Sequence, residues 1–148
     1  MKKPEPKRIA WTLVVLAGGK SRRMGRDKAS LRLGSITLLE ETVRPLEGMF
    51  DDILIAVSAG QSLPPVPWRT AEDEVSGQGP LRGILTGLRN ARHPSAFVLA
   101  CDMPGLSPAV VRKIIAASRG ADVAIAANED ALKEPLLGVY KKTVLGDI

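Results

Sequence analysis

Residues 9–28 read IAWTLVVLAGGKSRRMGRDK, an uncharged apolar run followed by two glycines and a basic segment. The apolar and β-branched residues at 9–16 predict a strand that is buried on both faces. Open α/β sheets bind their ligands directly after such a strand. Adjacent glycines let backbone amides approach a ligand closely, and the basic side chains that follow can contact phosphate oxygens. The stretch therefore predicts an α/β sheet with an anion-binding loop. The alternative interpretation is a glycine turn flanked by solvated arginines.

This loop differs from the two common phosphate-binding motifs. Gly25 is followed by Arg26, so G-x-x-x-x-G-K-[ST] does not fit, and Lys20 occupies the place of the second glycine in G-x-G-x-x-G. The physical basis of anion binding is nevertheless shared with those motifs.

The rest of the chain alternates short apolar runs with helical patterns, which predicts an α/β sheet covered on both faces. Thr37 and Glu40 have the spacing of a capping box, so a helix is expected towards residue 48, and Pro45 would bend it or end it early. A second helix is expected over 80–92 with one buried stripe, and a third from Pro108, capped by Ser107, to about residue 118. The buried stripe comprises Leu81, Ile84, Leu85 and Leu88. Further strands are expected at 51–58, 68–71, 96–101, 122–127 and 136–141.

Length and composition favour one globular domain. The chain has 148 residues, of which 45% are hydrophobic and 25% are charged, values typical of a folded protein. We expect a basic, flexible tail at 1–8 and a single domain over 9–148. The longest uncharged apolar stretch is too short to span a membrane, and the tail does not resemble a signal peptide, so a cytoplasmic protein without membrane contact is expected.

Two single residues limit the metal chemistry. Cys101 is the only cysteine and His93 the only histidine, which excludes an intramolecular disulfide and a cysteine- or histidine-rich metal site. Any metal would be bound by oxygen. Cys101, with apolar neighbours, is interpreted as a small buried residue, and His93 as a residue at a helix end.

The net charge of +5 is unevenly distributed. Residues 1–8 carry +3, residues 20–32 carry +5 and residues 33–148 carry −3. Nucleic-acid binding usually needs a broad basic surface and aromatic side chains, and only 3% of the residues are aromatic. A compact basic loop suits a small polyphosphate better, while simple solvation of the basic residues remains the alternative.

Three motifs together resemble one protein family. They are L-A-G-G-x-S-x-R-M-G-x-D-K at 16–28, G-P-L-x-G at 79–83 and C-D-M-P at 101–104. In this order and spacing they resemble the MobA-like nucleotidyltransferases. Within that family the resemblance is greatest to the molybdenum cofactor guanylyltransferases, because relatives that use CTP tend to have L-A-A-G and to lack Gly-Pro-Leu. The match covers roughly residues 10–140.

The resemblance implies a fold, a reaction and a set of site residues. The fold would be a doubly wound, Rossmann-like, mostly parallel sheet in three α/β/α layers, similar to the nucleotide-diphospho-sugar transferases. The reaction would transfer GMP from GTP to molybdopterin and release pyrophosphate, with Mg²⁺ held by Asp102. Lys28, Arg23 and Asp102 would be catalytic. Nucleotide binding would involve Leu16, Ala17, Gly18, Gly19, Arg23, Lys28, Asp73, Pro80, Leu81 and Asp102.

Other functions stay open at this stage. One alternative is a related nucleotidyltransferase that uses CTP or a sugar-phosphate acceptor. Another is a non-catalytic nucleotide-binding paralogue, since family members continue to a late Asn-x-Asn-Thr-Pro segment that this sequence lacks. Asp73 in its acidic run and Asp102 before Met-Pro could instead be a solvated residue and a turn cap. Other enzymes of molybdenum cofactor biosynthesis are expected partners, and nucleic acid is not.

Overall fold

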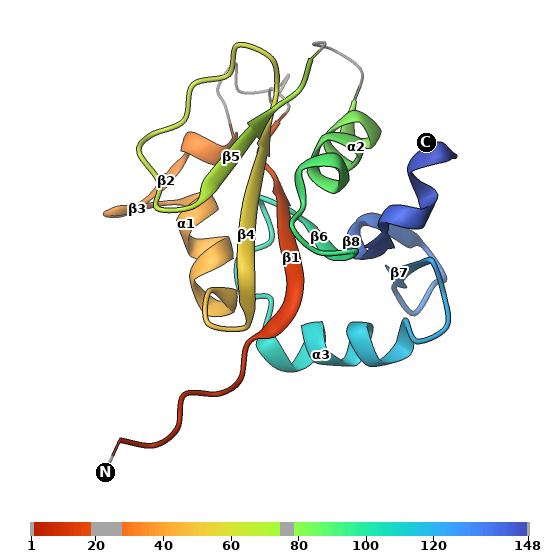
Figure 1. The fold of residues 1–148 in the computed structure, drawn as a ribbon. Helices are drawn as coiled ribbons and strands as arrows, with labels where there is room; N and C mark the ends of the chain where they lie inside the picture. The colour runs from red at the N-terminus through yellow and green to blue at the C-terminus, as the bar shows by residue number, and fades with distance from the viewer. Residues whose placement is uncertain (1, 19–27, 75–78, 148) are drawn as a thin grey trace.

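A computed structural model describes residues 2–18, 28–74 and 79–147, with only the backbone of Lys28 included (Figure 1). The apolar run that opens the fold forms β1 (Ile9–Leu16), with the bounds expected from the sequence. Residues 2–8 before it are exposed and form no helix or strand. The other strands are β2 (Arg32–Leu33), β3 (Ile36–Thr37), β4 (Phe50–Val57), β5 (Arg69–Glu72), β6 (Ser95–Ala100), β7 (Val123–Ala127) and β8 (Lys133–Lys141). The α-helices are α1 (Leu38–Val43), α2 (Pro80–Asn90) and α3 (Pro108–Ala117), and the 3₁₀ helices are η1 (Lys28–Ser30), η2 (Arg44–Leu46) and η3 (Lys142–Gly146).

The main sheet has six strands in the order β5-β4-β1-β6-β8-β7. β5, β4, β1 and β6 pair in parallel, whereas β8 is antiparallel to both of its neighbours. The chain builds outward from β1 to β5 and then crosses through α2 to β6 on the other side of β1. The strand order therefore reverses between β1 and β6, which is where a doubly wound sheet forms a ligand crevice. The expectation of a mostly parallel, doubly wound sheet is confirmed.

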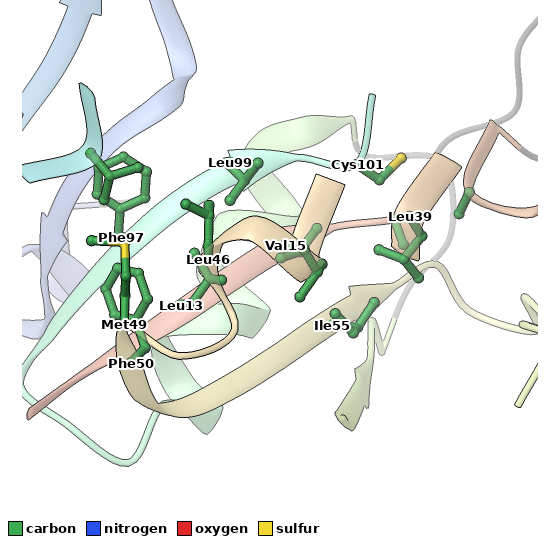
Figure 2. Packing of buried hydrophobic residues seen from close by; sticks show 14 of the residues in the cluster. Leu13, Val15, Leu39, Leu46, Met49, Phe50, Ile55, Phe97, Leu99 and Cys101 are labelled. Carbon is green, nitrogen blue, oxygen red and sulfur yellow. The ribbon is translucent and has the colours of Figure 1, made fainter. Parts of the chain in front are cut away.

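The two faces of the sheet are covered by separate hydrophobic clusters, which gives three layers. On one face, alternate side chains of β1 such as Leu13 and Val15 pack with Leu39 of α1 (Figure 2). Val111 of α3 belongs to the same cluster. On the other face, Val14 packs with Ile84 of α2. β1 is buried on both faces because it lies in the middle of the sheet.

Local sequence signals account for the helix ends. Thr37 Oγ1 accepts a hydrogen bond from the amide of Glu40 at 3.2 Å, and Glu40 Oε2 accepts one from the amide of Thr37 at 2.8 Å, which completes the capping box. α1 ends at Val43 because Pro45 follows, and the chain continues as η2. Ser107 caps α3 and Pro108 begins it, as expected.

Some features of the fold differ from the sequence-based expectations. Leu81 was expected in the buried stripe of the second helix but is 57% exposed, whereas Ile84 and Leu88 are buried. Gly83 of α2 lies against Leu16, the last residue of β1, so the turn before Gly83 extends past the end of that strand. The hairpin of β2 and β3 was not expected, because two-residue strands are too short to produce an alternating pattern.

Among the described residues, no helix combines the length and the apolar character needed to span a bilayer.

Candidate nucleotide-binding site at the carboxyl edge of the sheet

The predicted site residues that the structure describes gather at one edge of the sheet. β1, β4, β5 and β6 run in parallel, so their carboxyl ends meet at that edge. Leu16 ends β1 and is followed by Ala17 and Gly18. Asp73 follows β5 and Asp102 follows β6, while Pro80 and Leu81 begin α2 at the same edge. Motifs separated by more than 80 residues in the sequence thus come to one place in the fold.

Leu16 and Ala17 are held firmly by neighbouring strands. Leu16 O accepts a hydrogen bond from the Cys101 amide at 3.1 Å, and the Ala17 amide donates to Ala56 O at 2.9 Å. Both residues are buried, Ala17 with only 1% of its surface exposed. The Ala17 amide is therefore committed to the sheet, and these two residues position the exposed Gly18 that follows.

Gly18 is required by a close approach of the chain to itself. A Cβ atom at this position would lie 2.6 Å from Ser58 Oγ and 3.3 Å from the Ser58 amide nitrogen. The sequence suggested that the glycine lets a ligand approach; in the structure, its neighbour is the segment that follows β4.

Asp102 lies in an exposed turn directly after β6. The residue before it is fixed twice, because the Cys101 amide donates to Leu16 O and Cys101 O accepts a hydrogen bond from Thr42 Oγ1 at 2.7 Å. Cys101 itself is 4% exposed and belongs to a hydrophobic cluster, which confirms its interpretation as a small buried residue (Figure 2). Asp102 is therefore an exposed residue that directly follows a rigidly held residue at the carboxyl edge.

Asp73 extends the pairing of β5 with β4, since its amide donates to Val57 O at 2.9 Å. The side chain is half-buried, and no donor among the described residues lies within hydrogen-bonding reach of its buried Oδ1. A buried carboxylate oxygen without a donor is costly. A ligand or ion at this edge could supply the missing contact.

The amino terminus of α2 lies at the same edge. Gly79 precedes the helix with φ +73°, and no side chain among the described residues caps the first turn. Arg82 in this turn pairs with Glu74 at 3.3 Å. Backbone amides at the start of an uncapped helix favour an anion.

Three predicted site residues cannot be placed. Gly19 and Arg23 lie outside the described residues, as does the side chain of Lys28. Their roles in nucleotide binding and catalysis stay predictions, as do those of the described site residues.

The sequence analysis missed a group of polar contacts that hold the loops at this edge. Thr42 donates to the carbonyl of Cys101, the residue before Asp102, and Gln61 donates to the carbonyl of the predicted site residue Ala17. Glu72 accepts a hydrogen bond from the Gly60 amide at 2.7 Å. Thr42 is a polar residue at a buried helix position, which is a weak signal. No sequence pattern indicated a role for Gln61, because it begins a proline-rich segment that predicts only a loop.

A second charged cluster lies away from this edge, at Asp52 near the start of β4. Its side chain is 2% exposed and accepts hydrogen bonds from Thr12 Oγ1 at 2.7 Å, from Arg69 at 2.9 and 3.0 Å, and from the Arg92 amide at 3.1 Å. Burial raises the pKa of Asp52, but the hydrogen bonds from Thr12, Arg92 and Arg69 outweigh burial and hold the pKa below its ordinary value. These partners belong to the opposite end of the strands, so we interpret the cluster as structural. The sequence predicted that the second helix would end at residue 92, but α2 ends at Asn90, so Arg92 lies beyond it. His93, which follows Arg92, pairs with Asp51.

Comparison with known proteins identifies the family. Residues 13–148 match the MobA-like NTP transferase domain. The chain is 41% identical over 133 residues to a probable molybdenum cofactor guanylyltransferase of Mycobacterium avium. This alignment covers 86% of this chain and 68% of that protein. The chain is 35% identical over 137 residues to a protein with the same description in Carboxydothermus hydrogenoformans, which covers 90% of this chain and 66% of that protein.

A solved structure has the same fold. A crystal structure from Mycobacterium sp. strain JC1, described as a homologue of Mycobacterium tuberculosis rv0371c, superposes with a TM-score of 0.74 at 26% identity and covers 92% of this chain and 72% of that one. The expected fold class is thereby supported by structure as well as by sequence. This chain spans about two thirds of the length of the two curated relatives. On these matches, the chain belongs to the MobA-like NTP transferase family.

Proposed function

We propose that this chain is a molybdenum cofactor guanylyltransferase, which transfers GMP from GTP to molybdopterin and forms the guanine dinucleotide form of the cofactor. The observation that carries the proposal is the 41% identity, across 86% of the chain, to a relative with that description. The arrangement of the carboxyl edge is compatible with it, because loops, carboxylates and a helix start gather where doubly wound sheets bind nucleotides.

In the proposed reaction a phosphate oxygen of molybdopterin attacks the α-phosphorus of GTP. The bond from that phosphorus to the oxygen leading to the β-phosphate breaks, and pyrophosphate leaves with the electron pair. Phosphoryl and nucleotidyl transfer depend mainly on positioning and on stabilising the developing charge. We assign the charge stabilisation to Lys28 and Arg23, and the cradling of the nucleotide to the backbone from Leu16 to Gly19.

The described carboxylates fit a magnesium ion. Mg²⁺ typically binds one or two protein carboxylates together with phosphate oxygens and water. Within residues 2–18, 28–74 and 79–147, no group of three or more potential ligands forms a metal site by itself. Asp102 is exposed at the carboxyl edge, and Asp73 has a buried oxygen that no donor of the described residues reaches. We propose that Asp102 holds the ion and that Asp73 contacts the nucleotide; when bound, Mg²⁺ would neutralise charge on the phosphates.

The reaction would need molybdopterin from earlier enzymes of the same biosynthesis. We therefore propose those enzymes as partners, and the cytoplasm as the compartment where they meet.

Calorimetric titration with GTP, with and without Mg²⁺, and measurement of pyrophosphate release with molybdopterin test the proposal together. The expected result is GTP binding and release of pyrophosphate only when molybdopterin is present. CTP serves as the matched nucleotide, and a preference for CTP would instead favour a cytidylyltransferase. Binding of GTP without any turnover would favour a non-catalytic nucleotide-binding protein.

A further inference from the structure

Gln61 connects two of the loops at the carboxyl edge through its side-chain amide. Its Nε2 donates a hydrogen bond to Ala17 O at 2.7 Å, and its Oε1 accepts one from the Ser58 amide at 2.8 Å. Ala17 directly follows β1, and Ser58 directly follows β4. One side chain thus ties together the ends of two adjacent parallel strands.

Other contacts hold Gln61 itself in place. The Gln61 amide donates to Ser58 O at 3.0 Å, which closes a tight turn over residues 58–61. Gly60 in this turn has φ +73°, a conformation that favours glycine, and its amide donates to Glu72 Oε1 at 2.7 Å. Glu72 ends β5, so the turn is anchored to a third strand. The Gln61 side chain therefore extends towards Ala17 from a supported base.

The tie acts at Ala17, which belongs to the backbone segment proposed to cradle the nucleotide. Gly18 follows Ala17 and packs so closely on Ser58 that a Cβ atom there would collide with it. Because Gln61 holds Ala17 and Ser58 together, it fixes the separation on which this close packing depends.

We propose that Gln61 is a positioning residue for nucleotide binding, which fixes the backbone of Ala17 and Gly18 relative to the segment after β4. This inference rests on the proposed function, because the ligand is taken to be GTP. Gln61 is not assigned a contact with the nucleotide; it acts through the backbone of the loop. Loss of the tie should therefore weaken GTP binding more than it destabilises the fold.

The test compares Gln61→Leu with Asn90→Ala. Leucine has a similar size but cannot form either hydrogen bond. Asn90 offers a matched control, because its Nδ2 donates to Thr86 O at 2.8 Å at the far end of α2, away from the carboxyl edge. Gln61→Glu is a second variant, which keeps an acceptor for the Ser58 amide but loses the donor to Ala17 O.

Three measurements apply to each variant: melting temperature, the dissociation constant for GTP by calorimetry, and hydrogen exchange of the Ser58 amide. Both Gln61 variants should bind GTP about fivefold to tenfold more weakly, the scale of one lost hydrogen bond. Asn90→Ala should bind GTP within twofold of the parent. The Ser58 amide should exchange faster in Gln61→Leu than in Gln61→Glu.

The outcomes separate this inference from the proposed function. If the parent binds GTP and Gln61→Leu binds it within twofold of Asn90→Ala, Gln61 has only a structural role and the inference is wrong. If the parent protein itself fails to bind GTP, the proposed function is wrong and the inference falls with it. Weaker binding in both Gln61 variants, with normal binding in Asn90→Ala, supports the positioning role.

Discussion

Replacement of Asp52 by Asn should strongly destabilise the protein without a change at the candidate nucleotide site. The Asp52 carboxylate is 2% exposed and accepts four hydrogen bonds, two of them from the Arg69 guanidinium. Asparagine retains one acceptor oxygen, loses the negative charge and places an NH₂ group against donors. A buried charge that loses its partner costs roughly 3–5 kcal/mol of stability. The positive charges that remain are on Arg69, which is 35% exposed, and on Arg92, which pairs with Asp52 at 3.9 Å and is 64% exposed. Both can regain water, so we expect about 2–4 kcal/mol.

Urea and thermal unfolding followed by circular dichroism would measure this loss. A loss of about 3 kcal/mol corresponds to a decrease of roughly 6–12 °C in melting temperature for a domain of this size. Asp51→Asn is the matched control, because Asp51 is the neighbouring carboxylate, is 40% exposed and pairs only at the surface with His93. That control should lose about 1 kcal/mol or less.

The pH dependence of the same difference gives a second check. The folded-state pKa of Asp52 is lowered, so the carboxylate contributes stability that is complete above its unfolded pKa of about 3.9 and is lost as the pH falls through the folded value. The stability difference between the parent and Asp52→Asn should therefore be constant from about pH 7 to pH 5 and decrease below about pH 4. If Asp52→Asn loses no more stability than Asp51→Asn at pH 7, the assignment of a buried structural carboxylate is refuted.

Sequence periodicity predicted most of the main sheet because it records burial directly. From Thr12 to Leu16 β1 is buried on both faces, so the strand is uncharged and mostly apolar, and its bounds at Ile9 and Leu16 follow from the sequence. The start of α1 could be predicted as well, since the capping box from Thr37 to Glu40 is a local interaction. Leu81 is a residue whose burial periodicity predicts wrongly. Its spacing is helical, but exposure depends on how far α2 extends beyond β1, which is a tertiary property.

The candidate site could be predicted in part, for a related reason. Motif residues such as Asp102 follow buried strands, and parallel strands bring their carboxyl ends to one edge. The supporting contacts could not be predicted, because they join residues that are distant in sequence. Gln61 and Ala17 are 44 positions apart, and Thr42 and Cys101 are 59 positions apart. Their side chains have no periodic or motif signal before the fold places them together.

Three further predictions concern the carboxyl edge. Asp102→Asn should reduce Mg²⁺-dependent turnover about 10²-fold or more in a pyrophosphate-release assay, while GTP binding without metal, measured by calorimetry, should change little. Lys28→Ala should weaken GTP binding with or without metal and reduce turnover by about 10² to 10³, since it removes a charge expected at the triphosphate; near-normal turnover in both variants would contradict the catalytic assignment. Thr42→Val removes the hydroxyl that donates to Cys101 O at 2.7 Å, so it should cost about 1–3 kcal/mol of stability and let the Asp102 turn shift. Because a shift of a catalytic group lowers turnover, we expect Thr42→Val to turn over about tenfold more slowly. The control is Ser118→Ala at the end of α3, which removes a similar hydrogen bond, 2.6 Å long, from a hydroxyl to a backbone carbonyl. This variant should lose stability alone. Thr42→Ser should restore turnover because it keeps the donor, and equal turnover in Thr42→Val and Ser118→Ala would show that Thr42 only stabilises the fold.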